Sequence, residues 1–188
     1  MVITLISGGG VKCQVGDFSL TVDPQRTKAG NLTLRTETKL PIESFPGAEI
    51  IQGPGEYEIS GAKIRGVLLT EETNSTYFRT LYEVELDGIR AAFMNNLNAL
   101  PSSETLDRLG EIDILFLSVN QAKIKTKEAV VLIKQIDPKV IIPIDEKLMK
   151  GLAEELGQKV KAEEKLVVKR RDFLKEESSG KLVWLSQK

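Results

Sequence analysis

The sequence predicts an α/β fold in which two mixed β-sheets pack together with helices on the outside. In the first half of the chain, apolar and polar residues alternate, which is typical of antiparallel strands with one buried face. The second half alternates nearly continuous apolar runs with segments of helical periodicity, which predicts strand–helix–strand units. At 188 residues the chain fits one domain, which we expect to span residues 1–188.

The antiparallel part of the fold is predicted from alternation and turn residues. Strands are expected, in chain order, in residues 1–6, 11–15, 18–22, 57–59, 62–69, 82–86 and 89–94. Gly16-Asp17 joins two of them as a hairpin, and Asp87-Gly88 favours a type I′ turn between two others. Residues 25–46 are polar, and we expect them to be irregular.

The second half predicts three helices and further strands. Strands are expected in residues 112–119 and 139–144, and helices near residues 102–109, 126–136 and 146–156. Thr126 is the expected N-cap of the second helix, and Gly157 is the expected stop of the third. In the tail, residues 166–168 and 182–185 are expected to form a hairpin.

Composition and charge exclude several classes of function. The chain has 26 basic and 27 acidic residues, so its net charge of −1 argues against a nucleic acid or an anionic membrane as partner. No apolar run is long enough to span a membrane, and the first residues lack a signal-peptide pattern. The single cysteine excludes an intramolecular disulfide, so we expect a cytoplasmic location.

The chain contains no histidine. Histidine is the commonest zinc ligand and the commonest general base near neutral pH. Its absence excludes Ser-His-Asp triads, Cys-His dyads and every zinc site that needs imidazole. With one cysteine, zinc sites built from thiolates are excluded too. We therefore expect no metal and no other cofactor.

Three further features have simple structural interpretations. Cys13 alternates with polar residues, which favours a buried, inert thiol over a nucleophile. Glu56 and Glu58 could act as a carboxylate pair, but alternation places both on one face, which we expect to meet solvent. Tyr57 between them is expected in the core.

Five motifs in order point to a known fold. They are Thr21-Val22-Asp23-Pro24, Gly53-Pro54-Gly55-Glu56-Tyr57-Glu58, residues 82–92, residues 113–119 and residues 135–143. Together they resemble the metallo-β-lactamase superfamily, in particular its zinc-dependent-hydrolase-like branch, which includes sugar-phosphate lactonases. The resemblance runs from Ile3 to about Leu185 and implies an αββα sandwich.

In this family, histidines and aspartates at strand ends hold one or two zinc ions. The resemblance assigns the early Gly-His pair to residues 7–10 and the His-x-His-x-Asp-His cluster to residues 35–40. The bridging aspartate falls on Asn95-Asn96, and the late histidine falls near Asp145. Every zinc position that can be aligned is replaced, so the resemblance implies the fold with its zinc ligands missing.

A degenerate pocket is the remaining candidate site. Its residues are Gly8, Gly9, Gly10, Asn95, Asn96 and Asp145. The glycines could bind a phosphate through backbone amides, but a strand follows where a P-loop needs a helix, so a permissive turn is favoured. The asparagines could bind a sugar or a nucleotide edge, although asparagine is also common in turns.

Three functional hypotheses follow. We expect first a non-catalytic member of the fold, a pseudoenzyme with a structural, interaction or ligand-binding role, as a homo-oligomer or as the inactive partner of an active relative. The alternative is a hydrolase of a phosphate ester or lactone that uses a divalent ion held by Glu37, Asn96 and Asp145. A third is a metal-free module that binds a small molecule with the glycine turn and the asparagines.

Overall fold

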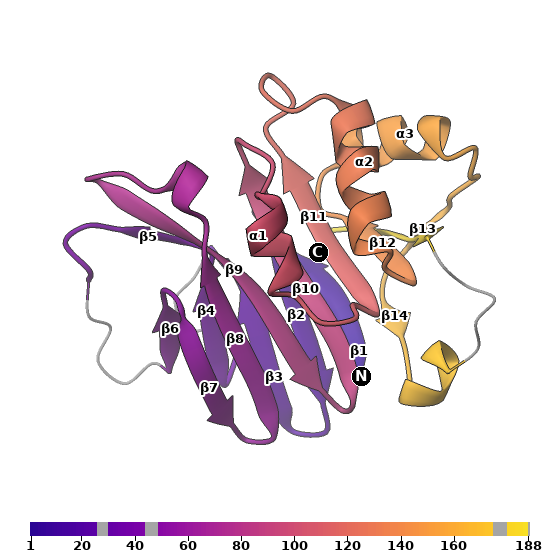
Figure 1. The fold of residues 1–188 in the computed structure, drawn as a ribbon. Coiled ribbons are helices and arrows are strands. Elements are labelled where there is room, and N and C mark those ends of the chain that lie inside the picture. The colour runs from indigo at the N-terminus through magenta and orange to yellow at the C-terminus, as the bar shows by residue number, and fades with distance from the viewer. Residues whose placement is uncertain (26–29, 44–48, 175–179, 188) are drawn as a thin grey trace.

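Two β-sheets pack face to face, and helices cover the outer side of one of them (Figure 1). The computed structural model of the chain describes residues 1–25, 30–43, 49–174 and 180–187. The predicted fold class, an α/β sandwich of mixed sheets, is confirmed.

The first sheet has six strands. In sheet order they are β14 (Leu166–Val167), β1 (Val2–Ile6), β2 (Gly10–Val15), β3 (Phe18–Val22), β4 (Leu32–Arg35) and β6 (Ile50–Gln52). Neighbours among β1, β2 and β3 are antiparallel, whereas β4 and β6 continue the sheet in parallel with β3. Val11 lies opposite Val22 and Cys13 opposite Leu20, and all four are buried, as their alternation predicts.

The second sheet has eight strands. Seven follow the order β15 (Lys181–Leu182), β12 (Val140–Pro143), β11 (Ile114–Val119), β10 (Ile89–Leu97), β9 (Tyr77–Leu86), β8 (Ala62–Leu68) and β7 (Gly55–Ile59), and β5 (Glu37–Lys39) pairs with β9. Strands β7 to β10 are antiparallel, and β10, β11, β12 and β15 are parallel. Asp87 and Gly88 both have positive φ, as the predicted type I′ turn requires.

The helices begin and end close to the predicted residues. They are α1 (Ser103–Asp107), α2 (Thr126–Ile136) and α3 (Glu146–Glu155), with the short 3₁₀ helices η1 (Thr70–Glu72) and η2 (Arg170–Phe173). Ser102 caps α1, and Gly157, with φ of +64°, ends α3. Thr126 is the first residue of α2 rather than its N-cap: that position is Lys125, whose amide donates to Glu128 Oε2 at 2.7 Å.

Apolar side chains form two buried layers. One layer lies between the sheets, where Phe93 and Phe116 stack with ring centroids 4.6 Å apart. The other lies between the eight-stranded sheet and the helices, which contribute residues such as Leu132 and Leu148. In the first layer, the buried Tyr82 hydroxyl accepts from the Gly53 amide at 3.0 Å and so fixes the β6–β7 connection against β9.

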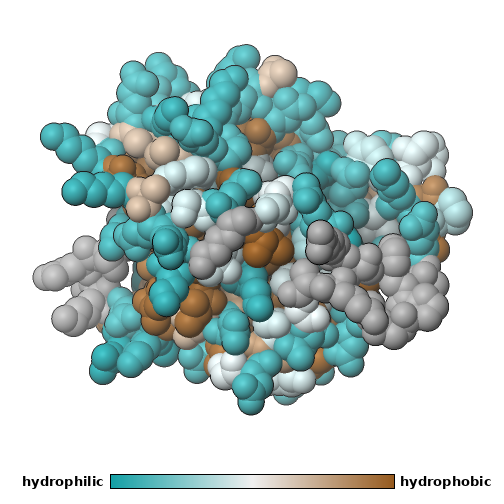
Figure 2. Space-filling model, turned by 180° about the vertical axis from the view of Figure 1, so that it is seen from behind, coloured by the Kyte–Doolittle hydropathy of each residue, from teal (hydrophilic) through white to brown (hydrophobic). Residues whose placement is uncertain are grey.

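The six-stranded sheet forms the back of the molecule. Within the described ranges, the three α-helices lie over the eight-stranded sheet, and no α-helix covers this face. Figure 2 shows it as small hydrophobic patches among hydrophilic side chains. Such separated patches are ordinary for a protein surface. No helix in the described residues is long and apolar enough to cross a membrane.

Two further local predictions are wrong. Residues 25–46 contain the strands β4 and β5 within their described part. The tail is not a hairpin: β14 pairs with β1, β15 pairs with β12, and β16 (Trp184–Leu185) pairs in parallel with β13 (Ala162–Glu163). The two-residue strands β14 and β15 thus each extend the edge of a larger sheet whose apolar face is already buried, and β13 and β16 form a separate two-stranded sheet.

A buried carboxylate attaches the C-terminal segment to the core. Asp113, immediately before β11, accepts from the amide of Arg90 and from the guanidinium of Arg170, both at 2.9 Å. Lys139 Nζ lies 3.3 Å from its other oxygen. The Asp113 side chain is 7% exposed, so its charge depends on these partners. It thereby links β10, Lys139 directly before β12, and η2.

Replacing Asp113 by alanine should therefore destabilise the fold. Lys139 and Arg170 are only partly buried and can regain water, so we expect a loss of about 2–3 kcal/mol in the free energy of unfolding. Urea denaturation measures this loss. The matched control is Asp107→Ala, at an exposed position, which should change stability by less than about 0.5 kcal/mol. Equal effects of the two substitutions would contradict this role of Asp113.

Candidate functional site

A buried guanidinium occupies the centre of the candidate site. Arg79 on β9 is 4% exposed. Its Nη2 lies 2.6 Å from Glu37 Oε2 on β5, and its Nε lies 2.8 Å from Glu72 Oε2 on η1. Its Nη1 donates to the backbone carbonyl of Asn95 on β10 at 3.0 Å. Two carboxylates and a carbonyl thus compensate the cost of burying this charge.

Glu72 connects this charge to the segment that follows β10. The Glu72 carboxylate accepts from the amides of Asn98 and Ala99 at 2.7 and 3.1 Å, and from the Asn98 side chain at 3.2 Å. Its side chain is only 3% exposed. Glu72 therefore needs Arg79 as its counter-charge, and together they hold η1 against the end of β10.

Asp23 joins the two sheets at the same place. It directly follows β3 and accepts from the amide of Thr36 at 2.9 Å, from the Thr36 hydroxyl, and from Asn95 Nδ2 at 2.8 Å. Asn95 itself is 3% exposed, and its Oδ1 has no hydrogen-bond partner within the described ranges. We call the group the Arg79 cluster; its members are Asp23, Thr36, Glu37, Glu72, Arg79 and Asn95.

The residues of this cluster do not fit a zinc site. Zinc needs imidazole, thiolate or free carboxylate ligands around an open position. Both carboxylates nearest the centre are already paired with the fixed positive charge of Arg79, which would also repel an incoming cation. Cys13 lies in the apolar layer between the sheets, and burial raises the pKa of its thiol to about 12. Within the described ranges, no three cysteine, aspartate or glutamate side chains group as metal ligands.

A small depression lies beside the cluster. It has a volume of about 170 Å³ and is lined by Arg35, Glu37, Lys39, Glu43 and Gln52. Pockets for organic ligands usually enclose about 300–1,000 Å³ with mostly apolar walls. This depression is smaller, and charged side chains of both signs form its walls. It has the character of a polar surface hollow next to Glu37.

The predicted glycine residues form a tight turn that is packed against the chain. Gly8 and Gly9 have φ of +83° and +81° between β1 and β2. A Cβ on Gly8 would lie 2.3 Å from Gln25 Cγ, and one on Gly9 would lie 3.4 Å from Ile144. Glycine is therefore required here by backbone conformation and close packing. This geometry matches the permissive turn better than an open phosphate cradle.

The other predicted site residues have separate partners. Asn96 donates its amide to Ser118 Oγ at 2.7 Å, and its Oδ1 lies 3.3 Å from the same hydroxyl. Asp145 Oδ1 accepts from the amide of Leu148 at 2.7 Å and caps α3. The glycine turn lies near Asp145, because Gly9 approaches the side chain of the preceding residue, Ile144. Asn95, in contrast, belongs to the Arg79 cluster. Their roles in ligand binding stay predictions.

Sequence reasoning missed the central residues of the cluster. Arg79 and Glu72 carry no motif, and a charged residue is expected at the surface unless it is paired. Glu37 is separated from Arg79 by 42 residues, so their contact has no local signal. Asp23 belongs to the Asp23-Pro24 motif, which indicates the end of a strand but not the place of Asp23 in this cluster.

The chain belongs to the β-lactamase superfamily. The family model for the β-lactamase superfamily domain matches residues 31–145, which include every member of the Arg79 cluster except Asp23. The resemblance to the metallo-β-lactamase superfamily is therefore confirmed.

Solved structures of low sequence identity share this fold. A Thermotoga maritima protein proposed as a Zn-dependent hydrolase of the metallo-β-lactamase superfamily matches with a TM-score of 0.75 at 18% identity, over 100% of this chain and 99% of its own. The metallo hydrolase Igni18 from Ignicoccus hospitalis gives 0.60 at 13%, over 89% and 99%. The isothiocyanate hydrolase from Delia radicum gut bacteria gives 0.59 at 11%, over 90% and 100%. A comparison with curated proteins gives no match.

Replacing Arg79 by methionine tests whether the cluster depends on its charge. The variant keeps an apolar stem of similar length but leaves Glu72 buried without a cation. We expect the free energy of unfolding to fall by about 3–5 kcal/mol, measured by urea denaturation. Arg65→Met is the matched control, because the Arg65 side chain is 48% exposed and its ion pairs contribute at most about 1 kcal/mol. Similar losses in both variants would contradict the assignment.

The buried thiol predicts a defined dependence of stability on pH. The Cys13 pKa rises from 9.0 to about 12 through burial, so above about pH 9 the unfolded chain loses the thiol proton while the folded chain retains it. The folded state then binds more protons, and the free energy of unfolding falls as pH rises. Cys13→Ala removes this contribution. The stability advantage of the wild type over this variant should therefore shrink by up to about 1.4 kcal/mol per pH unit.

Urea denaturation of both proteins between pH 7 and pH 10 measures the effect, because the difference between them cancels the titration of lysines. Reaction with a thiol reagent at neutral pH supplies the control: the native protein should be inert and the unfolded protein reactive. A difference that stays constant with pH, or rapid reaction of the native thiol, would contradict the burial of Cys13.

Proposed function

We infer that this chain is a non-catalytic member of its superfamily, a pseudoenzyme with a structural or interaction role. One observation carries the proposal: Arg79 lies between residues at positions that the family resemblance assigns to zinc ligands. Glu37 falls within the assigned histidine cluster, and Asn95 belongs to the Asn95-Asn96 pair on which the bridging aspartate falls. The Glu37 carboxylate and the Asn95 backbone carbonyl both contact the guanidinium. A side-chain cation thus stands among the ligand positions.

A guanidinium does not replace the chemistry of a metal ion. It is always protonated, offers only N–H donors and has no coordination position for water. A catalytic zinc ion lowers the pKa of bound water to about 7, which creates the attacking hydroxide. Arg79 is surrounded by the carboxylates of Glu37 and Glu72 and the carbonyl of Asn95, so it holds the strand ends together without a group that activates water.

The hydrolase alternative has less support. It needs Glu37, Asn96 and Asp145 to share one divalent ion. Glu37 pairs with Arg79, Asn96 with Ser118, and Asp145 caps α3. The small-molecule alternative relies on the glycine turn, where the positive φ values and the approach of Gln25 to Gly8 already account for the glycines. No contact in the described residues favours either of these functions over a non-catalytic role.

An interaction role requires a partner, which we propose to be another protein chain: a second copy or a catalytically active relative. Net charge near zero argues against nucleic acid as the partner.

Metal analysis tests the proposal most directly. Protein expressed in medium supplemented with zinc should contain far less than one zinc ion per chain after purification. Added Zn²⁺, Mn²⁺ or Mg²⁺ should leave its melting temperature unchanged, because a ligand stabilises a fold only if it binds the native state. A histidine-containing hydrolase of the same fold, purified in parallel, is the control. Stoichiometric zinc that survives dialysis, or turnover of a lactone or phosphate ester that requires a divalent ion, would overturn the proposal.

A further inference from the structure

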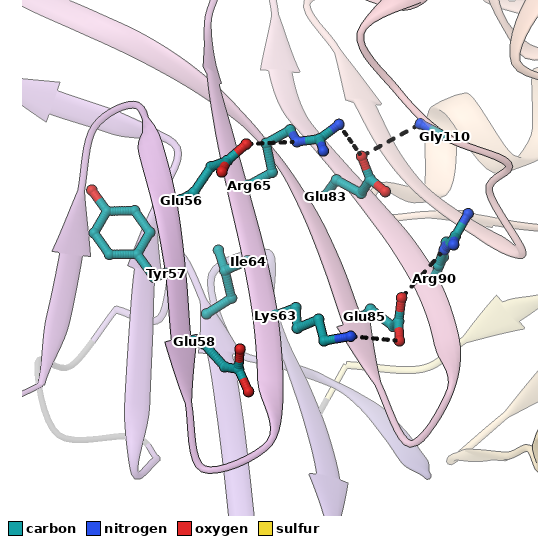
Figure 3. A pocket seen from close by; sticks show the side chains of 10 residues that line it. All are labelled: Glu56, Tyr57, Glu58, Lys63, Ile64, Arg65, Glu83, Glu85, Arg90 and Gly110. Atoms are coloured by element: carbon teal, nitrogen blue, oxygen red, sulfur yellow. Dashed lines mark hydrogen bonds and ion pairs between the residues drawn. The ribbon is translucent and has the colours of Figure 1, made fainter.

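On the outer face of β7, β8 and β9, each strand carries a column of charged side chains, and the sign of the charge alternates from one strand to the next (Figure 3). We call this arrangement the charge ladder. The columns are Glu56 and Glu58 on β7, Lys63 and Arg65 on β8, and Glu83 and Glu85 on β9. They line a shallow hollow of about 480 Å³, and no helix covers β7 and β8 in the described residues. The ladder therefore runs to the open edge of the sheet.

Each inner column is paired with a neighbour. Arg65 lies 3.5 Å from Glu56 and 3.7 Å from Glu83, which also accepts from the amide of Gly110. Lys63 lies 3.8 Å from Glu85. The acidic column at the edge has such a neighbour on one side only, and within the described ranges Glu58 forms no ion pair. The charge pattern is thus incomplete at β7.

The backbone hydrogen bonding of β7 is also incomplete, on the side that faces away from β8. Ser60 and Gly61, both with positive φ, close a two-residue turn between Ile59 and Ala62. In such a hairpin the pair next to the turn exchanges both hydrogen bonds, and bonded and non-bonded pairs then alternate. Glu56 and Glu58 are in the non-bonded pairs, so their N–H and C=O groups point away from β8. These groups form a free edge within the described part of the chain.

We propose that β7 binds an extended segment of a partner protein that carries lysine or arginine at alternate positions. The segment adds one antiparallel strand to the sheet. Its basic side chains lie beside Glu56 and Glu58 and continue the alternation of columns. Its intervening side chains are apolar, because they lie beside Tyr57 and Ile59, which pack against the core. The proposed binding at β7 does not depend on whether the Arg79 cluster is non-catalytic.

The same pattern opposes pairing of β7 with a second copy of itself. Antiparallel pairing that keeps the outer faces together places Glu56 or Glu58 of one copy opposite Glu56 or Glu58 of the other. Like charges directly opposite on neighbouring strands are destabilising. The edge therefore selects a basic strand over its own sequence, as edge strands with charged side chains resist self-association.

Binding of a short synthetic peptide in which lysine alternates with valine tests the proposal. Amide NMR of the full chain should show the Glu56 and Glu58 amides shifting and becoming protected from exchange on titration. A peptide with glutamate in place of lysine should not bind. A lysine peptide that is N-methylated at alternate residues should lose binding as well, because it keeps the charge but cannot form the backbone hydrogen bonds.

The variant Glu56→Lys/Glu58→Lys should weaken binding of the lysine peptide about tenfold, since two partly exposed charge contacts become repulsive. Glu154→Lys/Glu155→Lys, on the exposed side of α3, changes the net charge equally and should have no effect. Absence of binding at millimolar peptide, equal binding of the N-methylated peptide, equal loss in both variants, or shifts that avoid β7 would each overturn the proposal. None of these outcomes bears on the zinc content, which tests the proposed function separately.

Discussion

One buried positive charge, the guanidinium of Arg79, is the constraint on which the candidate site depends. A charge at this depth persists only with opposite charge around it, and Glu37 and Glu72 supply that charge. Because Glu72 also binds the amides after β10, neutralising Arg79 fixes the course of that segment. Through the Asn95 carbonyl and the Asp23 carboxylate, the same group joins the two sheets. Local backbone structure at three strand ends thus follows from the need to compensate one ion.

Much of the fold could be predicted because its signals are local. Alternation predicted the β2–β3 hairpin, the dipeptide Asp87-Gly88 predicted a turn whose residues both have positive φ, and Gly157 predicted the end of α3. The errors fall where local signal is weak. Strands β4 and β5 lie in a polar stretch, and the tail strands have two residues each, too few to establish a period. Their partners are set by which sheet edge is available, and that property belongs to the whole chain.

The site was less predictable than the fold, for a physical reason. Family resemblance located the strand ends where ligands belong, and the absence of histidine excluded imidazole chemistry. Neither observation could show that a buried arginine lies among these positions, because Arg79 and Glu72 look like ordinary surface residues in sequence and the pairing of Glu37 with Arg79 has no local signal. A buried ion pair is recognised by the burial of its side chains and the distance between them, and neither property leaves a periodic pattern in the sequence. Asp145 is the opposite case: the resemblance placed a family ligand near it, whereas in the structure it caps a helix.

The pairing of β1 with β14 has a consequence for how the chain acquires its structure during synthesis. Val2 precedes its neighbour on the outer side of the sheet, Val167, by more than 160 residues, so Val167 is synthesised much later. Until then one flank of the nascent sheet has no strand to pair with, and exposed flanks of this kind promote aggregation. Completion of the first sheet is therefore a late, long-range event, which makes folding slow relative to proteins built from local contacts.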